Sequence, residues 1–435
     1  MKKIILIIHI LFLSVAVFAQ DDVYPAKPQT EKITLANATV HVGNGTVIAN
    51  GFVTFENGKI IAVGETAPSA PGKLVDVKGK HVYPGLILSN SQLGLVEVNS
   101  VRATIDHTEI GVLNPSIRSI VAYNTDSRVI NTLKSNGILF ANVVPQGGTI
   151  SGSSTVVQLD AWNWEDAIYK ADGQMHMNMP SLFFRPNPFA AFRGVLETRT
   201  AADVIKEGLN QIEGIKSFFR EAAAYHKETV HSKINLKFEA VKALLEKKQK
   251  LFVHCDIVKE MLVAIDFAKE FGFDVVIVGA SESWQIADLL KQNNIAVILG
   301  QQHSLPTMAD DDVDQPYKAA TYLQNAGVLY AINDEDGQTR GRNLPFNAGT
   351  AVTYGITKEQ ALSAITLNAA KILGIDGKTG SIENGKDANI VISEGDILDM
   401  KTSIITHAFI QGRQVSLEDK HKQLNERYKQ KYGIK

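Results

Sequence analysis

A buried strand that ends abruptly in polar residues most constrains how this chain can fold. The apolar run from Val82 to Leu88 is followed directly by residues 89–92, which read Ser-Asn-Ser-Gln. Strands of this kind are typical of the (β/α)₈ barrel, where side chains at the carboxyl ends of the strands form the functional site. We therefore interpret this run as the first strand of a barrel and expect functional groups directly after it.

Further apolar strands alternate with amphipathic helices along the chain. The strands are expected at 138–144, 250–255, 274–279, 296–300 and 328–333. The alternation predicts a parallel sheet and, together with the first strand, favours a (β/α)₈ TIM barrel over an open sheet. We place the barrel at 82–375. Its irregular stretch, 90–200, is expected to form long loops that cover a site.

Short strands joined by tight turns flank the barrel on both sides. In residues 31–80 the turns are marked by Gly43-Asn44-Gly45 and by Asn57-Gly58, which are strong hairpin signals. A second set of short strands follows over 376–416. The last segment, 417–435, is charged and helical in composition, which predicts a solvated tail.

Residues 1–19 have the pattern of a secretory signal peptide. Two lysines precede an apolar run from Ile4 to Phe18, and Ala19 is the small residue before the expected cut at Gln20. The run is too short to span a membrane, and no later stretch is long and apolar enough. We therefore expect export to the periplasm or secretion. Cys255 is the only cysteine, so no internal disulfide can form.

Five groups of residues carry a resemblance to a known family. They are PGLI at 84–87, VHCD at 253–256 with EFG at 270–272, RNLP at 342–345 with AVTYG at 351–355, TLNAAKILG at 366–374, and GKDA at 385–388. In this order they resemble the amidohydrolase superfamily and its imidazolonepropionase-like branch. The resemblance implies a TIM barrel beside a small composite β-sandwich made of 31–80 and 376–416. It also implies hydrolysis of carbon–nitrogen bonds other than peptide bonds, in cyclic-amide substrates, by metal-activated water.

The resemblance identifies the positions at which the family holds its catalytic metal. They are Asn90, Gln92, His254, Gly279 and Asp334. A catalytic zinc ion needs about three protein ligands, and only His254 and Asp334 are good ones. Neutral amide oxygens suit calcium or magnesium better than zinc. The sequence therefore predicts a degenerate metal site, with less than about half an equivalent of zinc or iron.

The resemblance also implies roles for the two remaining ligand residues. Asp334 is implied as the base that activates water, and His254 as the group that polarises the substrate. Asp336 is an alternative for this aspartate, because the spacing before the RNLP segment leaves the alignment open by one residue. The residues expected to line the pocket are Asn90, Gln92, His303, Asp336 and Arg342.

Two interpretations of function remain open. The first is an exported hydrolase, and the second is an inactive ligand-binding or partner subunit that keeps the pocket. A relocated metal site is a further alternative, with candidate ligands Glu97, Asp106, His107, Glu109, Glu282, His303 and Asp336. The formal net charge of -2 argues against a nucleic-acid or polybasic membrane surface. We expect a small-molecule ligand, and either a homo-oligomer or pairing with an active relative.

Overall fold

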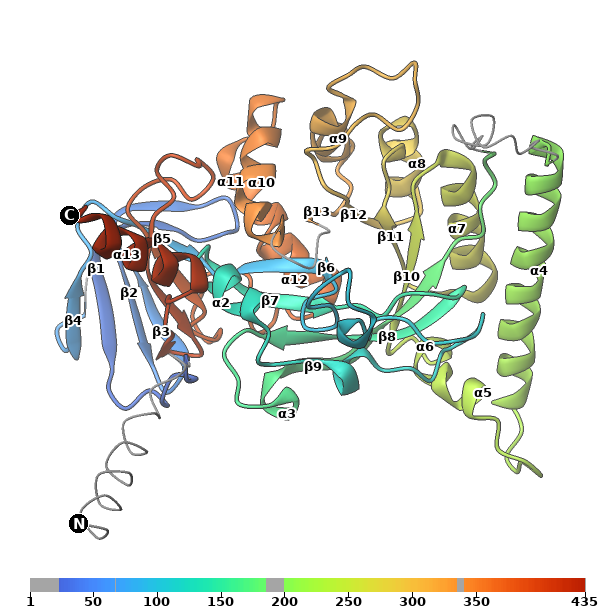
Figure 1. Ribbon diagram of the computed structural model, residues 1–435, viewed down its shortest axis with the longest axis horizontal. Coiled ribbons are helices and arrows are strands. Elements are labelled where there is room, and N and C mark those ends of the chain that lie inside the picture. Colours follow the sequence, from blue (N-terminus) through green and yellow to red (C-terminus); the bar gives the residue numbers. More distant parts are fainter. Residues whose placement is uncertain (1–22, 67, 185–198, 335–339, 435) are drawn as a thin grey trace, which may run out of the picture.

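The structure is a computed structural model that describes residues 23–66, 68–184, 199–334 and 340–434 (Figure 1). The predicted signal peptide, 1–19, and the candidate residue Asp336 lie outside the described residues. The described part contains two eight-stranded sheets, each with its own hydrophobic core. Among the described helices, none is long and apolar enough to cross a membrane.

The larger sheet is the predicted barrel, and its strands lie side by side in sequence order. Its strands are β6 (Leu86–Ser91), β7 (Ile138–Val143), β8 (Ile150–Gln158), β9 (Ile168–Asn178), β10 (Lys250–Cys255), β11 (Val275–Gly279), β12 (Ala296–Leu299) and β13 (Tyr330–Ile332). Most of their residues are buried on both faces of the sheet, as in a barrel covered by helices.

Strand β8 departs from the predicted all-parallel barrel. It pairs antiparallel with β7 and with β9, whereas the other neighbours in the sheet are parallel. Only residues 144–149 connect β7 to β8, which is too short for the crossover that a parallel neighbour needs. Serines and a glycine interrupt the apolar pattern of β8, so the sequence over 90–200 predicted loops where this strand lies.

One side chain joins the two end strands of the barrel sheet. Asn333 directly follows β13 and is fully buried. Its Oδ1 accepts hydrogen bonds from the backbone N–H groups of Ser89, at 3.0 Å, and Asn90, at 3.1 Å. Its Nδ2 donates to the carbonyl of Asn90, at 2.8 Å. These bonds hold the carboxyl ends of β6 and β13 together, next to Asp334.

Helices cover the outside of the barrel, as α4, α7, α8 and α9 do in Figure 1. The helices of the barrel are α2 (Arg128–Lys134), α3 (Trp164–Ala167), α4 (Ala201–Tyr225), α5 (Leu236–Ala240), α6 (Lys242–Leu245), α7 (Val258–Phe271), α8 (Ala287–Gln292), α9 (Gln315–Ala326), α10 (Leu344–Thr353), α11 (Lys358–Ala364) and α12 (Leu367–Leu373). Short 3₁₀ turns are η1 (Arg102–Thr104), η2 (Ser119–Ala122), η3 (Ser283–Ile286) and η4 (Arg340–Asn343). A capping box begins α4 at Thr200, and α7 ends at Gly272 in the left-handed conformation.

The smaller sheet combines both ends of the chain. Its strands are β1 (Ile33–His41), β2 (Val47–Glu56), β3 (Lys59–Gly64), β4 (Lys73–Asp76), β5 (His81–Pro84), β14 (Ile390–Ser393), β15 (Ile405–Ile410) and β16 (Arg413–Gln414). Strand β14 pairs antiparallel with β5, which joins the two halves. Helix α13 (Lys420–Tyr432) follows, at the position of the predicted tail.

Buried polar contacts join the smaller domain to the barrel. The hydroxyl of Tyr169 in β9 donates to Asp387 Oδ2 at 2.5 Å. Asp160, just after β8, accepts from Lys134 at 3.1 Å and from Arg413 in β16 at 2.9 Å. Because these charges are paired and hydrogen-bonded, their burial is tolerated, and the contacts fix the smaller domain against the barrel.

Candidate functional site

The five positions that the resemblance assigns to the metal, called the inherited positions below, lie at one end of the barrel sheet. Asn90 is in β6, His254 is in β10, and Gly279 ends β11. Gln92 directly follows β6, and Asp334 follows β13. All these strands run in the same direction and end at the same edge, so the five positions share the end of a barrel at which functional groups gather.

A pair of histidines forms the best-connected polar group at this end. His176 in β9 and His254 in β10 lie on neighbouring parallel strands, and Nδ1 of His176 is 2.9 Å from Nε2 of His254. His176 is fully buried and His254 is half-buried. His176 was not among the site residues predicted from the sequence. The available signal was the alternation of Gln174, His176 and Asn178, which places three polar side chains on one face of a strand.

The bonds beyond His176 determine which nitrogen atoms carry hydrogen. Gln174 Nε2 donates to the carbonyl of Leu373, which can only accept, so Gln174 Oε1 accepts from Ser154 Oγ. The Ser154 hydroxyl hydrogen is thereby used, and Ser154 Oγ accepts from Nε2 of His176, 2.8 Å away. His176 Nδ1 then accepts from Nε2–H of His254. This sequence of bonds leaves Nδ1 of His254 as a hydrogen-bond acceptor.

Burial keeps both imidazoles neutral near pH 7. It lowers the pKa of His254 to about 4 and lowers the pKa of His176 well below 6.5, with the neighbouring His254 adding to the effect on His176. A neutral His254 whose Nε2–H is bonded to His176 does not suit the polarising role that the resemblance implied. The arrangement favours a role in which Nδ1 of His254 accepts a hydrogen bond.

Asp334 directly follows Asn333, the residue whose side chain joins β13 to β6. Its carboxyl group is fully buried. Nearby on β6 and β7, Ser89 Oγ, Asn90 Oδ1 and Asn142 Oδ1 are buried without hydrogen-bond partners among the described residues. Buried polar atoms in this condition usually bond to water or ligand, so the end of the barrel beside Asp334 is suited to bind a polar molecule.

The donor set does not fit the family's transition-metal site. Gly279 has φ +93°, and a Cβ built on it would lie 2.7 Å from Oδ1 of Asp256, which accepts from Ser281 Oγ at 2.7 Å. A histidine is therefore poorly accommodated at this position. The Nε2 atom of His254 is bonded to His176. Within the described residues, no group of three or more His, Cys, Asp or Glu could hold a metal ion.

The residues predicted as ligands of a relocated metal site either form hydrogen bonds with other residues or lie in a separate loop. Glu97 accepts from Asn124 and Ser127, and Glu282 accepts from the first N–H of α7. His303 is exposed and bonds Thr350 at 2.7 Å. Asp106, His107 and Glu109 lie in the loop after η1. The remaining predicted pocket residue, Arg342, is half-buried in η4.

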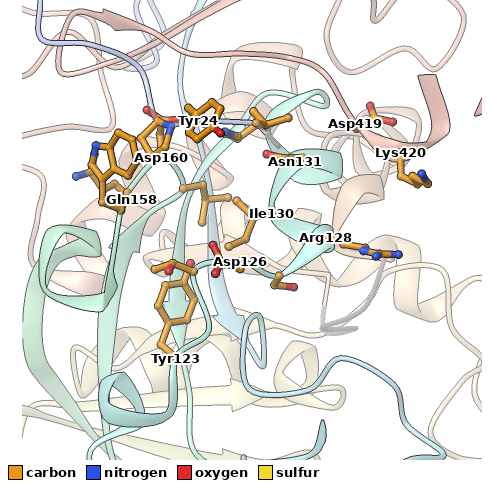
Figure 2. A pocket seen from close by; sticks show the side chains of 18 of the residues that line it. Tyr24, Tyr123, Asp126, Arg128, Ile130, Asn131, Gln158, Asp160, Asp419 and Lys420 are labelled. Carbon is orange, nitrogen blue, oxygen red and sulfur yellow. Dashed lines mark hydrogen bonds and ion pairs between the residues drawn. The ribbon is translucent and has the colours of Figure 1, made fainter. Parts of the chain in front are cut away.

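Two cavities lie in very different parts of the fold. One, of about 260 Å³, opens at the carboxyl ends of β10, β11 and β12 and is lined by Asp256, Gly279 and Gln302. The other, of about 740 Å³, lies between α2, the end of β8 and the start of α13 (Figure 2). Tyr24, Asp160 and Asp419 are among its lining residues. Gly279 is the one inherited position in the lining of the smaller cavity, and none lines the larger one.

Comparison with known proteins agrees with this fold. The model of the amidohydrolase family matches residues 318–415. The solved structure of an amidohydrolase from Thermotoga maritima is 27% identical, with a TM-score of 0.70, over 88% of this chain and 99% of that one. The imidazolonepropionase of Streptococcus gordonii is 22% identical over 81% of this chain and 86% of its own. These matches support the predicted amidohydrolase superfamily and its imidazolonepropionase-like branch, and they confirm the predicted fold class.

A further relative differs strongly in length. The amidohydrolase tasK of Hapsidospora irregularis is 21% identical over 80% of this chain, but the match covers only 38% of that protein. The chain therefore spans well under half of this relative.

Proposed function

We propose that the protein is a hydrolase of small cyclic amides, acting on carbon–nitrogen bonds other than peptide bonds. The observation that carries this proposal is the position of the His176–His254 pair and the buried Asp334 carboxylate at the carboxyl end of an amidohydrolase barrel. In barrels of this class that end forms the active site. Family membership supplies the reaction type, and the residues supply the groups that carry it out.

Each group has a chemical task in the proposed reaction. Asp334 takes a proton from the attacking water, as a general base must. His254 accepts a hydrogen bond at Nδ1 and so orients that water or the substrate N–H. The side-chain amides of Asn90 and Gln92 donate to the substrate carbonyl oxygen, on which negative charge develops. A metal-bound water would have a pKa near 7, and without that effect we expect slow turnover.

The second function is ligand binding without catalysis, and the mismatch of the metal positions favours it. Asn90, Gln92 and Gly279 stand where ligands are implied, and a Cβ built on Gly279 would lie 2.7 Å from Asp256 Oδ1. A panel of lactams, hydantoins and imidazolones separates the two functions when ring opening is followed by released amine or carboxylate and binding by calorimetry. Ring opening supports the hydrolase. Binding with no ring opening over days supports the inactive subunit.

We further propose that the protein is exported after removal of residues 1–19. The order of two lysines, an apolar run and Ala19 supports this. Sequencing the amino terminus of protein recovered from the cell envelope or medium tests the proposal, with Gln20 expected as the first residue. An intact Met1 would contradict it.

A further inference from the structure

The charged groups that line the 260 Å³ cavity at the carboxyl ends of β10, β11 and β12 are all negative. Two carboxylates, those of Asp256 and Asp311, line it. Its described lining residues include no lysine, arginine or histidine. Its other polar lining residues are neutral, among them Ser281, Gln302 and Gln315. The cavity therefore presents negative charge and neutral hydrogen-bonding groups to whatever enters it.

The carboxylate of the exposed residue Asp256 is positioned by Ser281. It follows β10, two residues after His254, and its Oδ1 accepts from Ser281 Oγ at 2.7 Å. It occupies the space that a side chain at position 279 would need. Thus a carboxylate stands at the edge of the cavity where the family resemblance places a metal-binding histidine.

Two buried glutamines add a complementary donor and acceptor. Gln302 and Gln315 line the cavity and are only 2% and 6% exposed. Oε1 of Gln302 and Nε2 of Gln315 have no hydrogen-bond partner among the described residues. An unpaired buried donor and acceptor are costly, and a ligand that offers both an N–H and a C=O can pair with both. An amide group offers these two functions together.

We propose that this cavity selects small amides that are neutral or positively charged and rejects those that carry a carboxylate. The proposal rests on the proposed function, because it names the substrate class of the same barrel end. A carboxylate on the ligand would lie against Asp256 and Asp311 with no cation of the described lining to balance it. At roughly 30 Å³ per water, the cavity holds about eight or nine waters, which suits a lactam with one short substituent.

Three lactams of similar size test the charge preference directly. They are pyroglutamate, which is an anion, pyroglutamide, its neutral isostere, and 3-aminopiperidin-2-one, which is a cation near pH 7. Binding to the full mature protein is measured by calorimetry and by ligand-observed NMR. We expect pyroglutamate to bind about tenfold more weakly than the other two, a difference in the range of two partly exposed charge contacts, one with each carboxylate.

Variants assign the preference to the cavity. Asp256→Asn is expected to reduce the discrimination against pyroglutamate to about threefold or less. Asp266→Asn is the matched control, because it removes the same charge from an exposed site on the outer helix α7. It is expected to leave the discrimination unchanged. Thermal unfolding of each variant verifies that it is folded, and Asp311→Asn gives a second measurement if Asp256→Asn does not fold.

The outcomes separate this inference from the proposed function. Pyroglutamate binding as well as pyroglutamide, or none of the three binding at millimolar concentration, would overturn the charge preference. An unchanged preference in folded Asp256→Asn and Asp311→Asn would also overturn it. The expected order of binding without ring opening would support the charge preference while contradicting the hydrolase. Ring opening with pyroglutamate as the preferred substrate would support the hydrolase while contradicting the charge preference.

Discussion

His254 links the stability of the fold to pH, because burial keeps its imidazole neutral. The pKa of His254 is lowered from 6.5 to about 4 in the folded protein. As pH falls below 6.5, the unfolded chain binds a proton that the folded chain does not, so the free energy of unfolding decreases. The loss for His254 alone reaches up to about 3 kcal/mol near pH 4, and the lowered pKa of His176 adds to it.

Urea unfolding between pH 7 and pH 4.5 measures this effect. His254→Gln is expected to reduce the dependence of unfolding free energy on pH over this range. His421→Gln, which changes an exposed histidine on α13, is the control and should follow the wild type. Curves for wild type and His254→Gln that run parallel would show that His254 is not held neutral by the fold.

At the scale of the element, the end of β11 disfavours a side chain at position 279. Gly279 combines φ +93° with a contact of 2.7 Å between its built Cβ and Asp256 Oδ1. Gly279→Ala is therefore expected to lower the free energy of unfolding by about 2 kcal/mol or more. We expect a histidine at this position to bring a similar cost rather than a restored metal ligand.

Gly45 provides a matched control for this substitution. It has φ +99° but nothing within 4 Å of its built Cβ, so Gly45→Ala carries the backbone strain without the collision. It is expected to cost about 1 kcal/mol. Equal losses for the two variants in denaturant unfolding would mean that Asp256 moves aside readily and that the strand end is not closed to side chains.

The elements also show how far the sequence could predict the structure. The apolar strands β6, β10 and β11 were predictable because each ends in a sharp change to polar or glycine residues. Strand β8 was not, because serines and Gly152 hide its pattern, and its antiparallel direction follows from a short connection. His254 and Asp334 were predicted as site residues from the family resemblance and from their places at the ends of apolar runs. His176 was missed because the segment around it lacks such a run.

At the scale of the whole molecule, the barrel of the family is present, and the positions that the resemblance assigns to the metal include Asn90, Gln92 and Gly279. Purified protein is expected to carry less than about half an equivalent of zinc or iron, because His254 and Asp334 alone rarely hold these ions. Elemental analysis after mild dialysis gives the value. One equivalent or more would contradict the prediction and would favour ligands outside the inherited positions.

The turnover of small cyclic amides by wild type and by Asp334→Asn, measured side by side, tests whether the protein is a hydrolase with Asp334 as its base. The buried Asp334 carboxylate is the proposed base, and removal of a general base costs about 10²- to 10⁴-fold in rate. We expect slow ring opening by the wild type and a loss of at least about 100-fold in the variant, with unchanged thermal unfolding. Turnover that survives in Asp334→Asn, or its absence in the wild type, would contradict the account.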